Sequence, residues 1–426
     1  MIDSGASPEP AAAPPMAPAS HPYAVLRNRD LALYLIGRFV ASLGQQMLTV
    51  AVGWELYEKT HSALMLGLVG LTQMLPMILF TLPAGHVADN FNRKQIIIVT
   101  TFMVALASIG LALISASGAP VFWIYGCLFV AGTARTFLWP ASSAFLPHLV
   151  VRQDFARAVA WSSGSFQLSS VVGPALGGAL IAVTRSAAPV YAFNAAAALI
   201  CLVLISLVRR HRAAAVKEKM TVRNLGAGFK FVFASPIILG TITLDLFAVL
   251  LGGATALLPV YAKDILRVGP SYLGLLQAAL PLGSLLCALV LAHRHPLQKA
   301  GRAMLWAVAM FGLATIAFGF STWFWFSFLM LFVCGAVDNI SVVVRHTLVQ
   351  LLTPDEKRGR VSAVNSLFIG TSNELGGFES GFVAHLASPV FSVVSGGVGT
   401  ILVVIAVALV WPQIRKFGRL DGASEK

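Results

Sequence analysis

Four carboxylates lie inside long apolar stretches of this sequence, namely Asp245, Asp338, Glu374 and Glu379. An ionisable group inside a membrane-spanning helix costs about 2.5–3.5 kcal/mol on insertion scales, and it usually faces a cavity or a partner. Burial favours the neutral form of an acid, so such a group can take up and release a proton. We interpret these acids as candidate proton carriers. The alternative is that one of them pairs structurally with a cation of the second half or with Arg135.

Two arginines lie in similar surroundings. Arg135 stands in the middle of an apolar run that is otherwise free of charge. Arg345 follows Asp338 by seven residues, and this spacing of about two helical turns places both side chains on one helix face. The two can form an ion pair or two steps of a polar path. We expect Arg135 and Arg345 to adjust how tightly nearby acids hold their protons.

Further polar residues are candidates for a substrate cavity. Arg38 and Gln45 are seven residues apart in the first long apolar run, and Thr49 continues the same helix face. Asn373 lies beside Glu374 in a later run. The alternative for Arg38 is that its long side chain reaches the membrane surface from near the helix start.

The composition indicates which kind of structure positions these residues. The chain is 57% hydrophobic and 11% charged, with a mean hydropathy of +0.81, whereas soluble domains carry about 25% charged residues. The apolar runs predict an all-α integral membrane protein with about 12 membrane-spanning helices, since about 20 residues cross the hydrocarbon core. We expect two six-helix bundles, both chain termini in the cytoplasm, and the lipid bilayer as surroundings.

The distribution of the positive charge, which is +13 net, predicts how the chain crosses the membrane. Basic residues gather in alternate loops, for example Arg93, Lys94, Arg152 and Arg157, while the opposite loops hold few. Such a bias places the basic loops in the cytoplasm. We therefore expect no nucleic-acid partner.

The expected organisation follows from where the apolar runs stop. It consists of a disordered tail over residues 1–24, a six-helix bundle over 25–208, a linker over 209–235, a second six-helix bundle over 236–412 and a cytoplasmic tail over 413–426. Within the linker, Leu225, Phe229 and Val232 recur at helical spacing. This pattern predicts an amphipathic helix on the cytoplasmic interface.

The sequence shows no pattern typical of a soluble active site. Its four cysteines all fall inside apolar runs, where they read as small buried residues. We find no phosphate-binding glycine loop, no metal-ligand cluster and no nucleophile elbow. We expect no enzyme activity, no metal and no cofactor, with a proton gradient as the energy source.

A short polar segment separates the apolar runs 64–84 and 95–117. It contains Gly85, Asp89, Arg93 and Lys94, and such a segment must lie at a membrane face. One interpretation is a basic stop that fixes topology. The other is a gate latch, in which the carboxylate and the cations pin one helix to a neighbour in one conformation and release it in another.

This segment resembles the loop signature between helices two and three of the major facilitator superfamily. Gly85, Asp89, Arg93 and Lys94 match the signature, whereas Asn90 replaces its first cation and Asn92 replaces its second glycine. The resemblance implies a role in gating. It also implies two bundles that rock around a central site.

Two further motifs extend the resemblance. Arg135 is similar to the fourth-helix arginine that the superfamily links to proton transfer, although Trp139 replaces the glycine that follows it. The run Gly173, Pro174, Gly177 and Gly178 resembles a motif of superfamily antiporters that is associated with export. Tight helix packing alone is the alternative reading of these small residues.

The resemblance covers residues 25–412 and is greatest for the enterobactin-exporter-like and drug-efflux branch of bacterial exporters. It implies a monomeric inner-membrane transporter that exports a small amphipathic compound, such as a siderophore or drug, by proton antiport and alternating access. Two alternatives stay open. One is an importer of a nutrient or lipid on the same fold, and the other is a membrane sensor or scaffold that does not transport.

Overall fold

The computed structural model describes residues 23–209, 229–293 and 298–418, and within them the chain forms helices and no strands. Residues 1–22 of the expected N-terminal tail, most of the linker and the end of the C-terminal tail lie outside the described residues. The described end of the linker is helical over 229–234. There Val232 is buried and Phe229 packs edge-on against Phe368.

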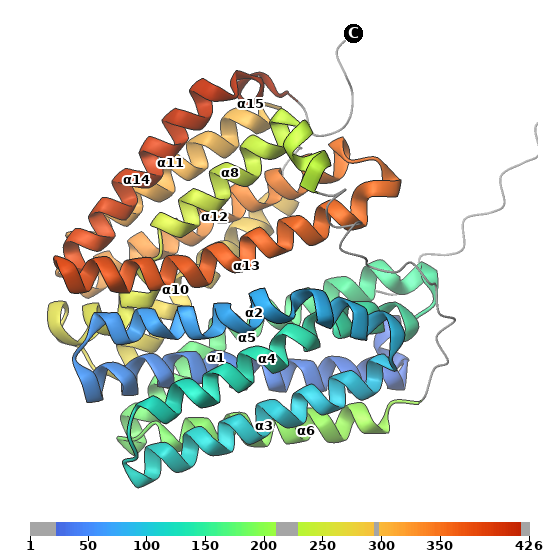
Figure 1. Cartoon of the computed structure of the whole chain (residues 1–426), viewed down its shortest axis with the longest axis vertical. Helices are drawn as coiled ribbons and strands as arrows, with labels where there is room; N and C mark the ends of the chain where they lie inside the picture. Colours follow the sequence, from blue (N-terminus) through green and yellow to red (C-terminus); the bar gives the residue numbers. More distant parts are fainter. Residues whose placement is uncertain (1–22, 210–228, 294–297, 419–426) are drawn as a thin grey trace, which may run out of the picture.

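The first half of the chain forms one helical bundle (Figure 1). Within it, α1 packs on α5 and α6, α3 packs on α4 and α6, and α2 packs on α4. The helices are α1 (Arg29–Thr60), α2 (Ala63–Asn90), α3 (Arg93–Ser117), α4 (Phe122–Phe145), α5 (Phe155–Thr184) and α6 (Ala188–Leu207).

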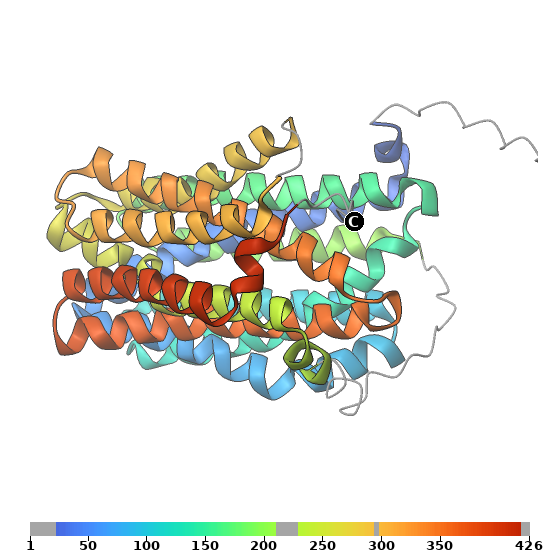
Figure 2. The same ribbon diagram turned by 90° about the horizontal axis from the view of Figure 1, so that it is seen from above.

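The second half forms another bundle, in which α10 and α11 pack on α12, and α8 packs on α13 and α14. Its helices are α8 (Pro236–Leu251), α9 (Leu258–Val260), α10 (Pro270–Ala292), α11 (Ala300–Gly319), α12 (Phe324–Leu352), α13 (Asp355–Leu386), α14 (Pro389–Val410) and α15 (Pro412–Lys416). Figure 2 shows that the long helices of both bundles run in roughly the same direction.

The segment after α8 departs from a regular helix. Gly252 and Gly253 end α8, and the chain then continues through a 3₁₀ turn (Ala254–Leu257), α9 and a π-helical turn (Tyr261–Ile265). Irregular backbone at membrane depth occurs where it is buried in protein or lines a cavity. Residues of this segment, among them Thr255 and Leu258, line a cavity between the bundles.

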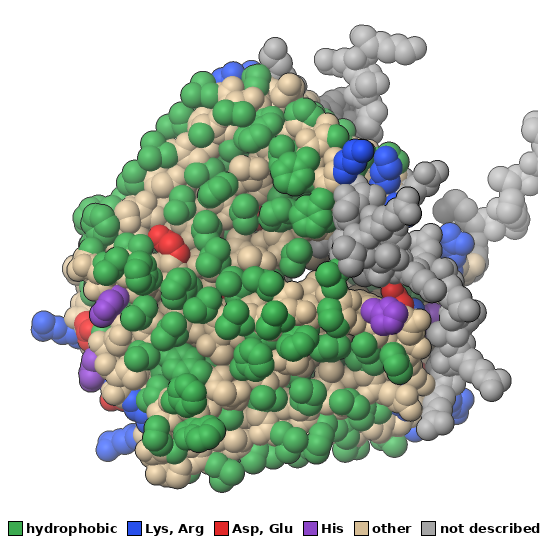
Figure 3. Space-filling model, viewed as in Figure 1, with side chains coloured by type: hydrophobic (Ala, Val, Ile, Leu, Met, Phe, Trp, Pro, Cys, Tyr) green, Lys and Arg blue, Asp and Glu red, His purple; other side chains and the backbone are tan. Residues whose placement is uncertain are grey.

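Among the described residues, ten helical segments are long and apolar enough to cross a membrane. The long helices α4 and α13 are not among the ten, and they carry the predicted site residues Arg135, Glu374 and Glu379. They pack among the other ten, so the expected all-α membrane fold is confirmed. Figure 3 shows one face covered mainly by hydrophobic side chains, as lipid contact requires.

The helix α2 is longer than the sequence pattern indicated. It continues to Asn90, so the polar segment begins inside the helix and only Phe91 and Asn92 connect α2 to α3. The side chain of Asn92 accepts a hydrogen bond from the backbone amide of Lys94 at 3.0 Å. This cap satisfies an amide that the new helix leaves unpaired, so α3 can start at once.

The two bundles meet through α2 against α13 and α5 against α10. Because successive long helices run in opposite directions, the connections between them lie at two ends of the bundles. We call the end with the α2–α3 and α4–α5 connections the basic end, because it carries most of the cations, and we call the other the opposite end. The orientation of these ends in a membrane stays a prediction from the charge bias.

Candidate functional site: a central cavity between the bundles

A cavity of about 660 Å³ lies between the two bundles. Its walls come from α1 to α6 on one side and from the segment after α8, α10, α12 and α13 on the other. Ligand pockets in proteins measure about 300–1,000 Å³ and combine apolar walls with a few polar groups. This cavity has both properties and is the candidate substrate site.

Two ionisable side chains line the cavity among the described residues, Arg135 from α4 and Glu374 from α13. They come from different bundles and interact electrostatically. They are not among the direct ion pairs that the described residues form. The cavity therefore holds one cation and one acid that attract each other across the boundary between the bundles.

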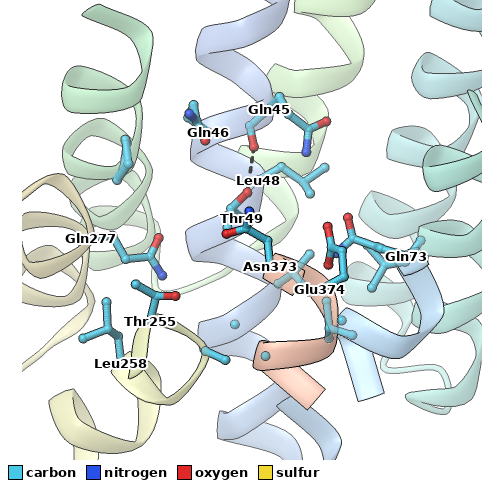
Figure 4. Close-up of a pocket in the computed structure, with 18 of the residues that line it drawn as sticks. Gln45, Gln46, Leu48, Thr49, Gln73, Thr255, Leu258, Gln277, Asn373 and Glu374 are labelled. Atoms are coloured by element: carbon cyan, nitrogen blue, oxygen red, sulfur yellow. Dashed lines mark hydrogen bonds between the residues drawn. The ribbon is translucent and has the colours of Figure 1, made fainter. Parts of the chain in front are cut away.

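Side-chain amides supply most of the remaining polarity. Figure 4 shows Gln45 and Gln46 on α1, Gln73 beside Glu374, and Gln277 beside Thr255. Gln46 donates a hydrogen bond to the hydroxyl of Ser170 at 2.8 Å, which ties α1 to α5. Such a bond fixes the wall of the cavity rather than serving a ligand.

A second polar pair sits in the wall between α3 and α6. The amide of Asn194 donates a hydrogen bond to the hydroxyl of Ser108 at 2.8 Å, and both residues line the cavity. A β-carbon at Gly44 would lie 2.6 Å from the side-chain oxygen of Asn194. Glycine at this position therefore lets α1 approach α6 closely.

The cavity brings together part of the predicted set. Gln45, Thr49, Asn373, Arg135 and Glu374 all line it. The amide of Asn373 also donates a hydrogen bond to the backbone carbonyl of Ile369, which holds it along α13. The roles of these residues stay predictions.

Other predicted residues lie elsewhere. Arg38, half-buried, is close enough to Tyr34 and Cys201 to interact with them electrostatically, and it is not part of the cavity lining. Asp338 and Glu379 are half-buried and also lie outside the lining. Glu379 accepts a hydrogen bond from the hydroxyl of Ser380 at 3.4 Å.

Arg345 pairs with Asp245 rather than with its helix neighbour Asp338. The ion pair joins α12 to α8, and both side chains are buried. Neither residue lines the cavity. This arrangement corresponds to the structural alternative that the sequence left open for one of the intramembrane acids.

The loop signature holds the basic end of the first bundle together. Arg93 donates a hydrogen bond to the carbonyl of Ala144 in the last turn of α4 at 3.1 Å, and it contacts His148 in the 3₁₀ turn that follows. Lys94 donates to the carbonyls of Ser206 and Val208 at 2.7 and 2.6 Å. Cations at helix C-termini satisfy free carbonyls and stabilise the helix dipole.

The acid of the signature is placed differently. Asp89 lies exposed in the last turn of α2, while Gly85 is buried in the same helix. Asp89 takes part in none of the ion pairs that the described residues form. An exposed acid outside these ion pairs is what a gate latch would have in its released conformation, and the gating role stays a prediction.

The small-residue motif of α5 contacts helices in both bundles. A β-carbon at Gly173 would lie 3.1 Å from the carbonyl of Leu43, and one at Gly177 would lie 2.9 Å from the Cα of Met47, both on α1. A β-carbon at Gly178 would instead lie 3.0 Å from the Cα of Gly274 on α10. Pro174 lines the cavity between these contacts.

The opposite end is closed by polar bonds between the bundles. The hydroxyl of Tyr57 on α1 donates a hydrogen bond to Asp264 in the π-helical turn. Beside it, Lys263 forms an ion pair with Glu58 at 2.9 Å. The ammonium group of Lys263 also lies 5.9 Å from the ring centroid of Trp54, within cation–π range.

Sequence reasoning did not single out Gln73, Gln277, Tyr57 or Asp264. Gln73 and Gln277 are polar but uncharged residues inside apolar helices, and this polarity was the only sign in the sequence that they could face a cavity. The partners Tyr57 and Asp264 are 207 residues apart, so no local spacing connects them.

Known proteins resemble this chain along most of its length. The family model described as transmembrane secretion effector matches residues 20–425. The enterobactin exporter EntS of Escherichia coli O1:K1 is 27% identical over 388 residues, which cover 90% of this chain and 92% of that protein. EntS of Shigella flexneri is 27% identical over 390 residues, with the same coverage.

Solved structures share the fold at lower identity. A POT family transporter in complex with 5-aminolevulinic acid has a TM-score of 0.72 at 13% identity, covering 91% of this chain and 96% of that chain. A bacterial homologue of the lysosomal transporter Spinster has a TM-score of 0.72 at 14% identity, covering 93% and 98%. The chain belongs to the major facilitator superfamily of membrane transporters, in the family of transmembrane secretion effectors.

Proposed function

We propose that this protein exports a small amphipathic compound, such as a siderophore or a drug-like molecule, across a bacterial inner membrane by proton antiport. The observation that carries the proposal is that Arg135 and Glu374 face one cavity from different bundles. The similarity of the chain to the enterobactin exporter EntS supports export as the direction of transport.

The contacts between the bundles support a mechanism of alternating access. Two kinds of contact close the opposite end. Gly178 packs against Gly274, and the hydroxyl of Tyr57 donates a hydrogen bond to Asp264. If the basic end is cytoplasmic, as the charge bias predicts, and is the end that opens when the opposite end is closed, substrate enters the cavity from the cytoplasm. Rocking of the bundles then opens the cavity to the other side.

Glu374 is the acid best placed to couple protons to this movement. It lines the cavity, whereas Glu379 and Asp338 do not, and Asp245 is committed to Arg345. A carboxylate at Glu374 attracts Arg135 across the boundary and favours one arrangement of the bundles. Protonation removes that attraction, so the proton and the conformation are linked.

The experiment is accumulation of a labelled compound panel in everted membrane vesicles, with and without an uncoupler. We expect accumulation that the uncoupler abolishes and that Glu374→Gln reduces at least tenfold. Glu379→Gln, on the same helix, separates the two acids of α13. A loss in Glu379→Gln with full activity in Glu374→Gln overturns the assignment of the proton site.

Two other outcomes decide between the remaining readings. Uncoupler-sensitive accumulation that appears only in right-side-out vesicles makes the protein an importer on the same fold. A protein that moves no compound in either orientation, yet whose deletion phenotype is rescued by Glu374→Gln, is a sensor or scaffold.

A further inference from the structure

Three cavity amides are free to bind a ligand. Gln45, Gln73 and Gln277 have half-exposed side chains, and these amides take part in no hydrogen bond to other residues within the described part of the chain. They come from α1, α2 and α10, so both bundles contribute. Figure 4 shows Gln73 and Gln277 on opposite sides of the cavity.

The apolar part of the lining has little capacity for aromatic stacking. Among the described residues that line the cavity, Phe166 is the one aromatic side chain, and the rest of the apolar wall is aliphatic. Sites that bind aromatic ligands or organic cations usually place several aromatic faces around them. This wall favours contact with aliphatic groups.

The charges of the lining also cancel. Arg135 is attracted by Glu374, so neither is available as the single partner of a strongly charged ligand. Glu374 would repel a polyanion, and Arg135 would repel a cation. The lining therefore matches a ligand without net charge.

An amide side chain offers two N–H donors and one carbonyl acceptor from one group. Its natural complement is another amide or a hydroxamate, which presents a carbonyl acceptor and a donor on neighbouring atoms. Resting on the proposed function, we infer that the exported substrate is a net-neutral, aliphatic compound rich in amide or hydroxamate groups, held between Gln45 and Gln73 of one bundle and Gln277 of the other.

The test is calorimetric binding to the purified full-length protein in detergent, with three probes. The first is a metal-free neutral cyclic trihydroxamate, the second is the tris-catecholate enterobactin and the third is tetraphenylphosphonium. We expect the trihydroxamate to bind at least tenfold more tightly than either aromatic probe. Equal or tighter binding of an aromatic probe, or no binding of the trihydroxamate, overturns the inference.

Variants test the contact residues. A hydrogen bond contributes about 0.5–1.5 kcal/mol net, so Gln73→Leu and Gln277→Leu should each weaken trihydroxamate binding about twofold to twelvefold. Thr347→Val is the matched control, because Thr347 bonds only to its own helix at Val343 and lies outside the lining. Unchanged binding in both glutamine variants contradicts the inference.

The same probes in everted vesicles separate this inference from the proposed function. Uncoupler-sensitive accumulation of enterobactin without the trihydroxamate keeps proton-driven export and overturns the substrate class. Glutamine-dependent binding of the trihydroxamate without accumulation keeps the ligand class and contradicts export.

Discussion

The hydroxyl of Tyr57 donates a hydrogen bond to the carboxylate of Asp264 and so joins the end of α1 to the π-helical turn that follows α8. The neighbouring residues Glu58 and Lys263 form an ion pair between the same two segments. Each bond connects one bundle to the other. The bundles cannot separate at this end without breaking both.

Removal of the Tyr57 hydroxyl should favour opening at the opposite end. A hydrogen bond to a charged group contributes about 1.5–3 kcal/mol, so Tyr57→Phe should raise the ratio of open to closed molecules by roughly tenfold or more. Glu58→Gln should have a smaller effect, because the Glu58 side chain is 52% exposed and such pairs contribute about 0.2–1 kcal/mol.

Arg185 caps the end of α5 in the first bundle, and Arg267 lies between the π-helical turn and α10 in the second. Spin labels at these two positions can measure the opening by electron–electron distance, after the four native cysteines are replaced by alanine. The matched control is Lys59→Gln, since Lys59 pairs with Glu55 inside α1 and connects no bundles. If Tyr57→Phe leaves the distance distribution of the starting protein unchanged, the bond does not hold this end closed.

A side chain at Gly178 should prevent closure of the same end. A β-carbon there would lie 3.0 Å from the Cα and amide nitrogen of Gly274, which are backbone atoms that cannot yield locally. We expect Gly178→Val to lose transport and to shift the spin-label distances toward the open form.

The control on the same helix is Gly164→Ala, where an added β-carbon meets no atom within 4 Å. Alanine in a helix is more stable than glycine by about 0.5–1 kcal/mol, so this variant should transport normally and unfold at a slightly higher temperature. Normal transport by Gly178→Val would show that the bundles do not need this contact.

The sequence was sufficient to predict the helices and to include Arg135 and Glu374 among the candidate ionisable residues. Runs of apolar residues set the helix positions, and the cost of burying charge made Arg135 and Glu374 conspicuous. The same cost made Asp245 conspicuous but did not reveal its partner. Asp245 and Arg345 are 100 residues apart in the chain, and the packing of α8 near α12 brings them together.

The amides of the cavity were harder to identify. An uncharged glutamine inside a membrane helix costs less than an ion, so Gln73 and Gln277 carried a weak signal. Their importance comes from facing one cavity from two bundles, which depends on the register of α2 and α10. Helical spacing within one segment does not determine that register.

The buried pair of Asp245 and Arg345 should contribute to stability rather than to proton coupling. Asp245→Asn leaves a buried guanidinium without its counter-charge, and breaking a buried pair costs about 3–5 kcal/mol. We expect a clear fall in the unfolding temperature of the purified protein, with the coupling of the remaining folded molecules intact.

The double variant Asp245→Leu with Arg345→Met is the informative control. Replacing both charges with apolar side chains is often neutral or stabilising by about 1–4 kcal/mol, so the unfolding temperature should recover. Loss of uncoupler-sensitive transport in a stable double variant would instead place the pair in the proton path.

Transport of a net-neutral compound against one proton should respond to membrane potential. Each cycle then moves one positive charge inward while the substrate moves outward without charge. In everted vesicles, a lumen-positive potential drives the proton out of the lumen and the substrate into it, and each 100 mV contributes about 2.3 kcal/mol per charge. Valinomycin with high external potassium sets up that potential without a pH gradient.

We expect accumulation of the neutral trihydroxamate under the lumen-positive potential and none under the reversed gradient. Glu374→Gln should remove the response, because the variant has no carboxylate among the described residues that line the cavity. Accumulation driven by a pH gradient yet indifferent to potential would require an electroneutral exchange, in which a monovalent cation leaves for each proton that enters. That result would contradict the net-neutral substrate while leaving Glu374 as the proton site.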